Sequence, residues 1–367
     1  CRILSNIICI DDDKEIFGGT TVCISKGGDV YRFGRTYAHE HTSIPIKFYP
    51  LKNIKQLACG FLHSVYLDFD GNVFSFGDNS EGQLGNGGKK CYSPQKLEEL
   101  PLCTQISCGE FFTICVSEDG NLFSFGSNSH GQLGHGDMDK RDSPKKIESL
   151  ENIDFVECGG YHVFCKLLND DVYFWGNGNP FLSGDVPYQS NPQKEDSWPK
   201  NVVDIKCGPC HALILTNEGM VYSYGLNYYG QLGQPQVQEL RNPKKIDKLS
   251  RIIRIECGHK HSVCIDNENN IYFFGSNSSG QLGLGSINQL SSPMEHPTLR
   301  NIIDVSSKGG HTFVKTSDNK IFAFGKNMYA QTGEELSDEI ITTPIQVFED
   351  NEEIWYSNFN KSRAKSA

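Results

Sequence analysis

The sequence is poor in positive charge and in long apolar runs. Its 367 residues include 34 Lys or Arg against 45 Asp or Glu, a formal net charge of −11. Without a global positive field to attract phosphates, the balance argues against direct nucleic-acid binding. No run of about 18 apolar residues suggests a membrane-spanning helix. The mildly apolar Cys1–Ile10 leads into Asp11, Asp12 and Asp13 without a small-residue cleavage site, so we expect a soluble, non-secreted chain.

Recognisable catalytic motifs are also missing. The sequence has no Gly-rich phosphate loop, no nucleophile elbow, no His-Glu-x-x-His zinc motif and no cofactor fingerprint. We therefore expect no catalytic residues, no cofactor and no metal site.

What the sequence does contain is a repeat. An aromatic-glycine pair recurs seven times, at intervals of 43 to 50 residues. Its seven copies are Phe33-Gly34, Phe76-Gly77, Phe125-Gly126, Trp175-Gly176, Tyr224-Gly225, Phe274-Gly275 and Phe324-Gly325. A Cys-Gly pair precedes five of these copies, and a Gly-Gln-Leu-Gly turn follows four of them. A fixed period of this length is typical of solenoids, propellers and other repeat architectures.

Each repeat predicts four short strands separated by glycine turns, without a competing amphipathic helix. In the second repeat these strands are Ile54–Ala58, His63–Leu67, Asn72–Phe76 and Gln95–Leu97. The third strand carries aromatic residues two positions apart, mostly with a small residue between them, which suits the stacking of twisted sheets. Seven such sheets bury their faces by closing radially, so the sequence predicts an all-β, seven-bladed β-propeller of four-stranded antiparallel blades.

The predicted propeller is one domain over residues 1–348, followed by an extension over 349–367. Its repeats span about 6–53, 54–100, 101–150, 151–200, 201–250, 251–300 and 301–348. Leu4–Ile10 matches Leu249–Ile255, so the chain is expected to supply the first inner strand itself. Glu353–Tyr356 is a second candidate for the closing strand, and the tail after it is expected to fray.

The repeat carries a family resemblance. The segment Cys59–Leu97 reads Cys-Gly-x-x-His-Ser, then Gly-x-Val-x-Ser-Phe-Gly-x-Asn-x-x-Gly-Gln-Leu-Gly, then Ser-Pro-x-x-Leu. It resembles the repeat of the regulator of chromosome condensation, and the likeness covers Asn6–Phe348. The resemblance implies the propeller fold strongly. It implies little about function, because members of the family do unrelated jobs.

The 14 cysteines follow the repeat rather than a redox or metal pattern. Nine occupy two repeat-equivalent positions in different blades, too far apart for disulfides. We therefore expect buried free thiols and a reducing compartment, the cytosol or the nucleus. Cys207-Gly208-Pro209-Cys210 matches a dithiol motif, but strands flank it on both sides, so we interpret it as a structural turn.

Histidines recur at one repeat position as well. A histidine that begins the second strand can hydrogen-bond its own turn or the next blade, so we assign these residues a structural role. They are His63, His162, His211, His261 and His311.

Departures from the repeat are better pointers to function, because site residues need not repeat. The fourth repeat replaces Gly-Gln-Leu-Gly with a segment that contains Phe181 and continues to Tyr188 and Trp198, and the first repeat places Tyr37 at its turn. These side chains are candidates for partner binding if they are exposed. The alternative is that they pack into a neighbouring blade.

These observations favour a non-catalytic, monomeric protein-interaction scaffold. The alternative implied by the resemblance is guanine-nucleotide exchange on a Ran-like small GTPase, for which the founding member has a β-wedge and aspartates in its Gly-x-x-His turns. Here Gly126–Gln132 is regular at the wedge position, and Glu110 is the sole acid in those turns. The resemblance also includes chromatin binders, which use a basic tail; this sequence has no such tail, so chromatin binding is not favoured. Plant UV-B photoreceptors of the family need a dense tryptophan cluster, and the small number of tryptophans argues against that function. This chain has three tryptophans.

Overall fold

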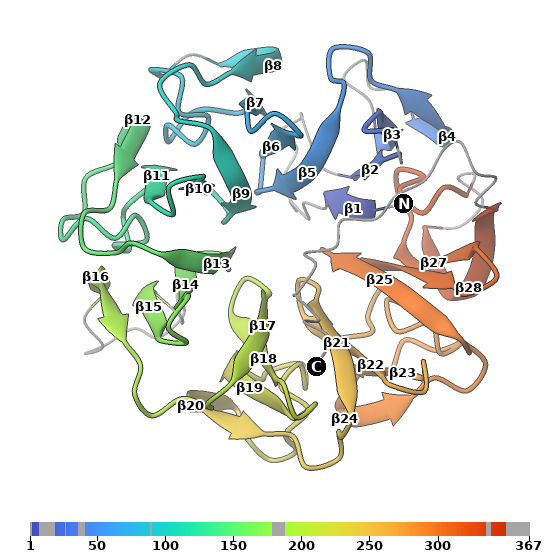
Figure 1. The fold of residues 1–367 in the computed structure, drawn as a ribbon. Helices are drawn as coiled ribbons and strands as arrows, with labels where there is room; N and C mark the ends of the chain where they lie inside the picture. Colours follow the sequence, from blue (N-terminus) through green and yellow to red (C-terminus); the bar gives the residue numbers. More distant parts are fainter. Residues whose placement is uncertain are drawn as a thin grey trace.

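The computed structural model describes residues 2–6, 19–25, 27–35, 41–88, 90–177, 188–334 and 339–349. These ranges contain 28 strands and no helix, in seven four-stranded antiparallel sheets. No segment of these ranges forms a helix that could cross a membrane. The sheets stand as blades around a common central axis (Figure 1). The predicted all-β, seven-bladed propeller is confirmed.

Each blade consists of four consecutive strands, and the chain runs from the innermost strand outward. Blade 1 contains β1 (Arg2–Asn6), β2 (Thr20–Ile24), β3 (Val30–Arg35) and β4 (His41–Lys47). Blade 2 contains β5 (Ile54–Cys59), β6 (His63–Asp68), β7 (Val73–Gly77) and β8 (Cys91–Lys96). Blade 3 contains β9 (Cys103–Cys108), β10 (Phe112–Ser117), β11 (Leu122–Gly126) and β12 (Arg141–Lys146). Blade 4 contains β13 (Ile153–Cys158), β14 (His162–Leu167), β15 (Val172–Gly176) and β16 (Gln189–Lys194).

The remaining blades repeat this order. Blade 5 contains β17 (Val202–Cys207), β18 (His211–Thr216), β19 (Val221–Leu226) and β20 (Glu239–Lys245). Blade 6 contains β21 (Ile252–Cys257), β22 (His261–Asp266), β23 (Ile271–Gly275) and β24 (Leu290–Glu295). Blade 7 contains β25 (Ile302–Lys308), β26 (His311–Thr316), β27 (Lys320–Lys326) and β28 (Ile340–Glu349).

Two strands have bounds that differ from the predicted ones. The fourth strand of blade 2 is β8 at Cys91–Lys96, so it begins earlier than the predicted Gln95–Leu97. The predicted inner strand at Leu4–Ile10 corresponds to β1 at Arg2–Asn6, which pairs with β2 and contacts β25 where the ring closes. Glu353–Tyr356, the second candidate for a closing strand, lies outside the described residues.

The hydrophobic core lies between the blades. One cluster joins Phe112 and Ile114 of blade 3 to Val156 and Trp175 of blade 4, and comparable clusters join the other neighbours. The second strand of a blade is the most buried, as in β6, whose residues are all buried, whereas the outer β8 has none that is fully buried. The burial gradient within a blade therefore runs from the inner strands to the rim.

Every outer strand contains a proline. A proline lacks a backbone N–H, and its presence in an edge strand discourages pairing with another chain. These residues are Pro45, Pro94, Pro144, Pro192, Pro243, Pro293 and Pro344.

The glycine of the aromatic-glycine pair is required by the backbone. Gly126 has a φ of 111°, and a Cβ added there would lie 2.5 Å from the Phe111 carbonyl oxygen. A side chain at this position would therefore be strained and would collide with the preceding turn.

The repeat histidines join one blade to the next. The Nε2 atom of His63 lies 3.0 Å from the Thr113 hydroxyl of blade 3, and that hydroxyl donates to the Gln83 carbonyl of blade 2 at 2.9 Å. Because the hydroxyl proton is committed to the carbonyl, the histidine must carry its proton on Nε2. We call this arrangement the histidine tie. It recurs at His211–Ser262, His261–Thr312 and, across the closure between blades 7 and 1, at His311–Thr21.

The histidine tie is missing at three junctions, which are the one between blades 1 and 2, where Thr20 stands at the histidine position, and both junctions of blade 4. Between blades 3 and 4, Phe112 replaces the histidine and Val163 replaces the hydroxyl residue, while the Trp175 indole donates to the Gln132 carbonyl at 2.9 Å. Between blades 4 and 5 the histidine is present but Ala212 stands where the hydroxyl should be. Neither ring nitrogen of His162 has a hydrogen-bond partner of normal geometry among the described residues.

Restoring the missing hydroxyl should stabilise the propeller. We expect Ala212→Ser to raise the free energy of unfolding by about 0.5–1.5 kcal/mol, because it places a hydroxyl partner beside the buried His162 ring, as at the other ties. Urea denaturation would measure the change. Val163→Thr is the matched control, since it places a hydroxyl at the equivalent position opposite Phe112, where no ring nitrogen is available. Equal stabilisation by both substitutions would contradict the role of the histidine tie.

Burial also makes stability depend on pH. It lowers the pKa of His63, His211 and His261 to about 3 and that of His162 to about 4, from 6.5. Below pH 6.5 the unfolded chain binds protons that the folded chain does not, so stability falls from about pH 6.5 toward pH 4. His162→Phe, which copies Phe112 of blade 3, should lessen this loss by up to about 1.4 kcal/mol per pH unit. Urea midpoints across this pH range would test it, and parallel curves for both proteins would contradict it.

Candidate interaction site at the channel mouth

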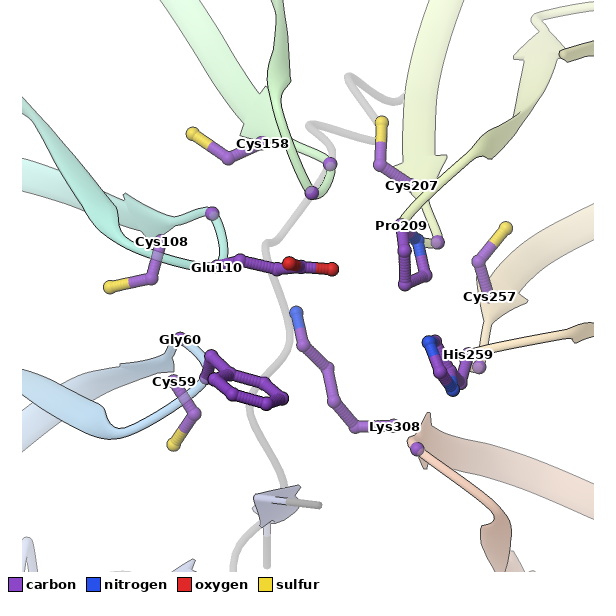
Figure 2. A pocket seen from close by; sticks show the side chains of 17 residues that line it. Cys59, Gly60, Cys108, Glu110, Cys158, Cys207, Pro209, Cys257, His259 and Lys308 are labelled. Atoms are coloured by element: carbon purple, nitrogen blue, oxygen red, sulfur yellow. The ribbon is translucent and has the colours of Figure 1, made fainter. Parts of the chain in front are cut away.

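The turns between the first and second strands of blades 2 to 7 surround a pocket at one end of the central axis (Figure 2), and we call this end the channel mouth. Backbone hydrogen bonds connect these turns from blade to blade. The Phe61 N–H donates to the Glu110 carbonyl at 2.8 Å, the Glu110 N–H to Gly160 at 3.1 Å, and the Gly160 N–H to Pro209 at 3.1 Å. His259 and Gly309 are joined in the same way at 2.9 Å. The mouth is therefore a platform whose turns hold one another in place.

The cavity at the mouth is small. Its volume is about 80 Å³, and the Cys-Gly pairs of blades 2 to 6 contribute much of its lining. Pockets for drug-sized ligands occupy about 300–1,000 Å³. The space fits a few water molecules or one side chain of a partner better than a metabolite.

Glu110 lies at this mouth. Burial raises the pKa of its carboxyl, although a hydrogen bond from the Tyr161 hydroxyl favours the charged form and opposes that shift. Figure 2 shows the carboxylate projecting into the channel mouth. Glu110 is therefore placed where an approaching macromolecule would meet a half-buried acid.

Lys308 also lies at the mouth, although the sequence pattern did not predict it. It occupies the position that is glycine in the Cys-Gly pairs, because blade 7 has Ser307-Lys308 instead. Its side chain extends into the channel mouth (Figure 2). Burial raises the pKa of Glu157 and, to about 8, that of Glu256 on the inner strands, and the charges of Lys206 and Lys308 oppose these shifts. Within the described residues Lys308 makes no ion pair. A departure from glycine at a repeat position is the signal that could have identified it.

His259 completes the polar groups at the mouth. Burial is the main cause that lowers its pKa, to about 4, and the neighbouring Lys260 lowers it further. The imidazole is therefore neutral at pH 7, and the mouth presents one acid, one lysine and one neutral imidazole.

Aromatic side chains extend this face outward. The His130 ring lies 4.6 Å from the Tyr161 ring and 5.1 Å from the Tyr188 ring, centroid to centroid. Tyr188 is 47% exposed, and Tyr229 lies beneath the Lys260 ammonium, 4.5 Å from its ring centroid. The structure thus brings the candidates Glu110 and Tyr188 to the same face, linked through Tyr161 and His130.

The remaining candidates for partner binding are Trp198, Tyr37 and Phe181. Trp198 is 5% exposed and packs against Phe164 and Tyr224, with ring centroids 5.0 and 5.5 Å apart. Its assignment as a partner-binding residue is corrected, because the chain between β16 and β17 folds it into the core between blades 4 and 5. Tyr37 and Phe181 lie outside the described residues.

The Cys207–Cys210 motif has no redox chemistry built around it. Burial raises the pKa of the Cys207 thiol strongly and that of Cys210 to about 12, which disfavours the thiolate that exchange requires. The twelve cysteines in the described ranges are free thiols, and no cluster of three metal-binding side chains occurs in those ranges.

The fold and this face define a repeat propeller with a non-repeating, partly charged surface at one channel mouth. Residues 27–357 match the RCC1-like domain family, and the chain belongs to that family.

Among curated relatives, the probable E3 ubiquitin-protein ligase HERC6 of Homo sapiens is 33% identical over 219 residues, which are 57% of this chain and 17% of that protein. The ultraviolet-B receptor UVR8 of Arabidopsis thaliana is 30% identical over 230 residues, 61% of this chain and 41% of the receptor. The chain therefore spans less than half the length of either relative.

Solved structures support the fold. Prp20p of Saccharomyces cerevisiae superposes with a TM-score of 0.75 at 19% identity, covering 90% of this chain and 86% of Prp20p. Human WBSCR16 gives a TM-score of 0.70 at 24% identity, covering 84% of this chain and 87% of WBSCR16.

Proposed function

We propose that this chain is a non-catalytic protein-interaction scaffold whose docking surface is the channel-mouth face. The observation that carries the proposal is the gathering of residues that depart from the repeat, among them Glu110, Lys308 and Tyr188, on one face of a stiff ring. The cavity volume of about 80 Å³ suits a side chain of a protein partner rather than a metabolite. We also propose that it acts in a reducing compartment, the cytosol or the nucleus, as its free thiols suggest.

Guanine-nucleotide exchange on a Ran-like small GTPase is the second candidate. Glu110 supports it by its position in a Gly-x-x-His turn at the mouth, and Prp20p, which shares the fold, binds Gsp1p and histones. The loop after Gly126 argues against the wedge mechanism, because it is a compact turn in which Asn128 binds the Leu133 N–H and Gln132 binds the His130 N–H. Ligase activity is not carried over from HERC6, because the match covers 17% of that protein.

An exchange assay separates the two candidates. For a scaffold, we expect this protein at micromolar concentration to leave the release of mant-GDP from a Ran-like GTPase unchanged. Glu110→Gln keeps the shape of the side chain and removes its charge, so it is the matched variant. Accelerated release that Glu110→Gln abolishes would overturn the scaffold proposal and support exchange.

Substitution at the channel mouth should weaken a protein partner. Once affinity purification has identified a direct partner, we expect Tyr188→Ala to weaken its binding by about 2 kcal/mol if the ring is a buried anchor of the complex. Lys308→Gly restores the repeat residue and should weaken binding without loss of the fold. Isothermal titration calorimetry would measure both, with Tyr92→Ala on the 68%-exposed outer rim as the control. A larger effect of the rim substitution would place the docking surface elsewhere.

A further inference from the structure

The opposite face of the propeller has a distinct chemistry. In an antiparallel blade the turn between the second and third strands lies at the end away from the Gly-x-x-His turn, as do the connections between blades. We call this end the connector face. In blades 2 to 7 the turns between the second and third strands contain no Lys or Arg and eight acidic residues, which are Asp70, Glu118, Asp119, Asp170, Asp171, Glu218, Glu268 and Asp318. The connections between blades on the same face carry both signs of charge, among them Lys52, Glu98 and Glu99. The Gly-x-x-His turns, by contrast, contain one acid.

Two exposed apolar residues lie together on the connector face, where blades 2 and 3 meet. Phe69 is 59% exposed and Leu102 is 47% exposed. Their segments are in contact, since the Cys103 N–H donates to the Gly71 carbonyl at 2.8 Å and a Cβ added to Gly71 would lie 3.1 Å from the Leu102 Cβ. The two side chains therefore belong to one surface.

Both residues are apolar at positions where most other blades have a polar residue; the exception is blade 4, where Leu168 occupies the Phe69 position. The positions equivalent to Phe69 are occupied by Glu118, Leu168, Asn217, Asn267 and Ser317, and those equivalent to Leu102 by Asn53, Asn152, Asn201, Arg251 and Asn301. An exposed aromatic or aliphatic side chain where the scaffold tolerates polar ones is a feature of interaction surfaces.

Acidic groups outnumber basic ones around these two residues, and the backbone is held rigidly. Lys52 precedes Asn53, whose carbonyl accepts the Phe69 N–H at 3.0 Å, and the Lys55 Nζ lies 3.5 Å from the Thr104 carbonyl. Five acidic residues of the neighbouring turns and connection face these two lysines, namely Asp70, Glu98, Glu99, Glu118 and Asp119. The Glu118 N–H donates to the Leu102 carbonyl at 2.9 Å, which places Glu118 and Asp119 beside Leu102. The buried Asp68 carboxylate accepts the N–H groups of Asp70 and Asn72 at 3.0 and 2.7 Å and so fixes the turn that carries Phe69. A rigid surface loses little conformational entropy when it binds.

The excess of negative charge around Phe69 and Leu102 indicates which class of ligand would bind there. An acidic border repels nucleic-acid phosphates and anionic lipid headgroups, and it also repels the same face of a second copy. It attracts Lys and Arg, while Phe69 and Leu102 offer contact area to an apolar side chain.

We propose that Phe69 and Leu102, bordered by Asp70, Glu118 and Asp119, form a docking surface for a basic segment of a partner protein that also carries an apolar anchor. This surface lies on the face opposite the proposed channel-mouth site, so an experiment that contradicts one proposed site does not contradict the other. The channel-mouth variants leave it intact.

Selection from a random peptide library displayed on phage tests the proposal with the full chain as bait. We expect the selected peptides to combine Lys or Arg with Leu, Ile or Phe. The double variant Phe69→Ser/Leu102→Ser should reduce the affinity of a fluorescein-labelled selected peptide at least about tenfold, the effect of a hot-spot residue. The charge reversal Glu118→Lys/Asp119→Lys should also reduce it and flatten its salt dependence.

The control is Met138→Ser/Ile287→Ser, which removes two exposed apolar side chains, 44% and 58% exposed, from loops at the channel-mouth end. It should leave peptide affinity unchanged, and circular dichroism and melting curves should show that all variants fold. The proposal is overturned if no selected peptide depends on Phe69 and Leu102, if the dependent peptides are acidic or uncharged, or if the control weakens binding as much. A dimer that the Phe69→Ser/Leu102→Ser variant dissociates in sedimentation would also overturn it by identifying a second copy as the occupant.

Discussion

The buried histidine tie is the directional contact that places neighbouring blades against each other at four of the seven junctions. Apolar packing between blades supplies most of the burial, but it is non-directional and does not by itself fix how one blade is placed against the next. The His63–Thr113 bond and its equivalents are directional, and each ends on the glutamine carbonyl of the Gly-Gln-Leu-Gly turn or its variant. They therefore fix the inner strands relative to the loops. The same tie at His311–Thr21 closes the ring between the last blade and the first.

Blade 4 shows what happens when the tie is absent. Its two junctions use a different set of groups, with Trp175 bonded to the Gln132 carbonyl on one side and, on the other, a His162 ring that makes no tie to the described residues of blade 5. Trp198, Phe164 and Tyr224 pack together at the second junction and supply apolar contact in place of a directional bond. A blade whose repeat has diverged is thus retained by aromatic packing, which explains why Trp198 is buried although it lies in a connection.

Most of the fold could be predicted because its determinants are local and repeated. The aromatic-glycine pairs, the histidines and the turn glycines are each visible in the sequence with their period. The site was only partly predictable. Glu110 could be identified as the one acid in the Gly-x-x-His turns, whereas Lys308 lies in the copy that lacks Cys-Gly and becomes meaningful only when the ring places it opposite blade 3. Trp198 and Tyr188 belong to the same divergent segment, and only the packing distinguishes the buried one from the exposed one.

The antiparallel blade also separates two kinds of surface in space. Alternate turns along the chain lie at opposite ends of the blade, so substitutions in one set of turns alter one face without touching the other. The acidic residues collect in the turns of the connector face, while the channel mouth carries Lys308 and Glu110 among aromatic groups. Because apolar clusters fill all seven junctions between blades and histidine ties join four of them, neither face needs to rearrange when the other is occupied. Two partners of different chemistry could therefore be held by one rigid ring, with the distance between them set by the length of its strands.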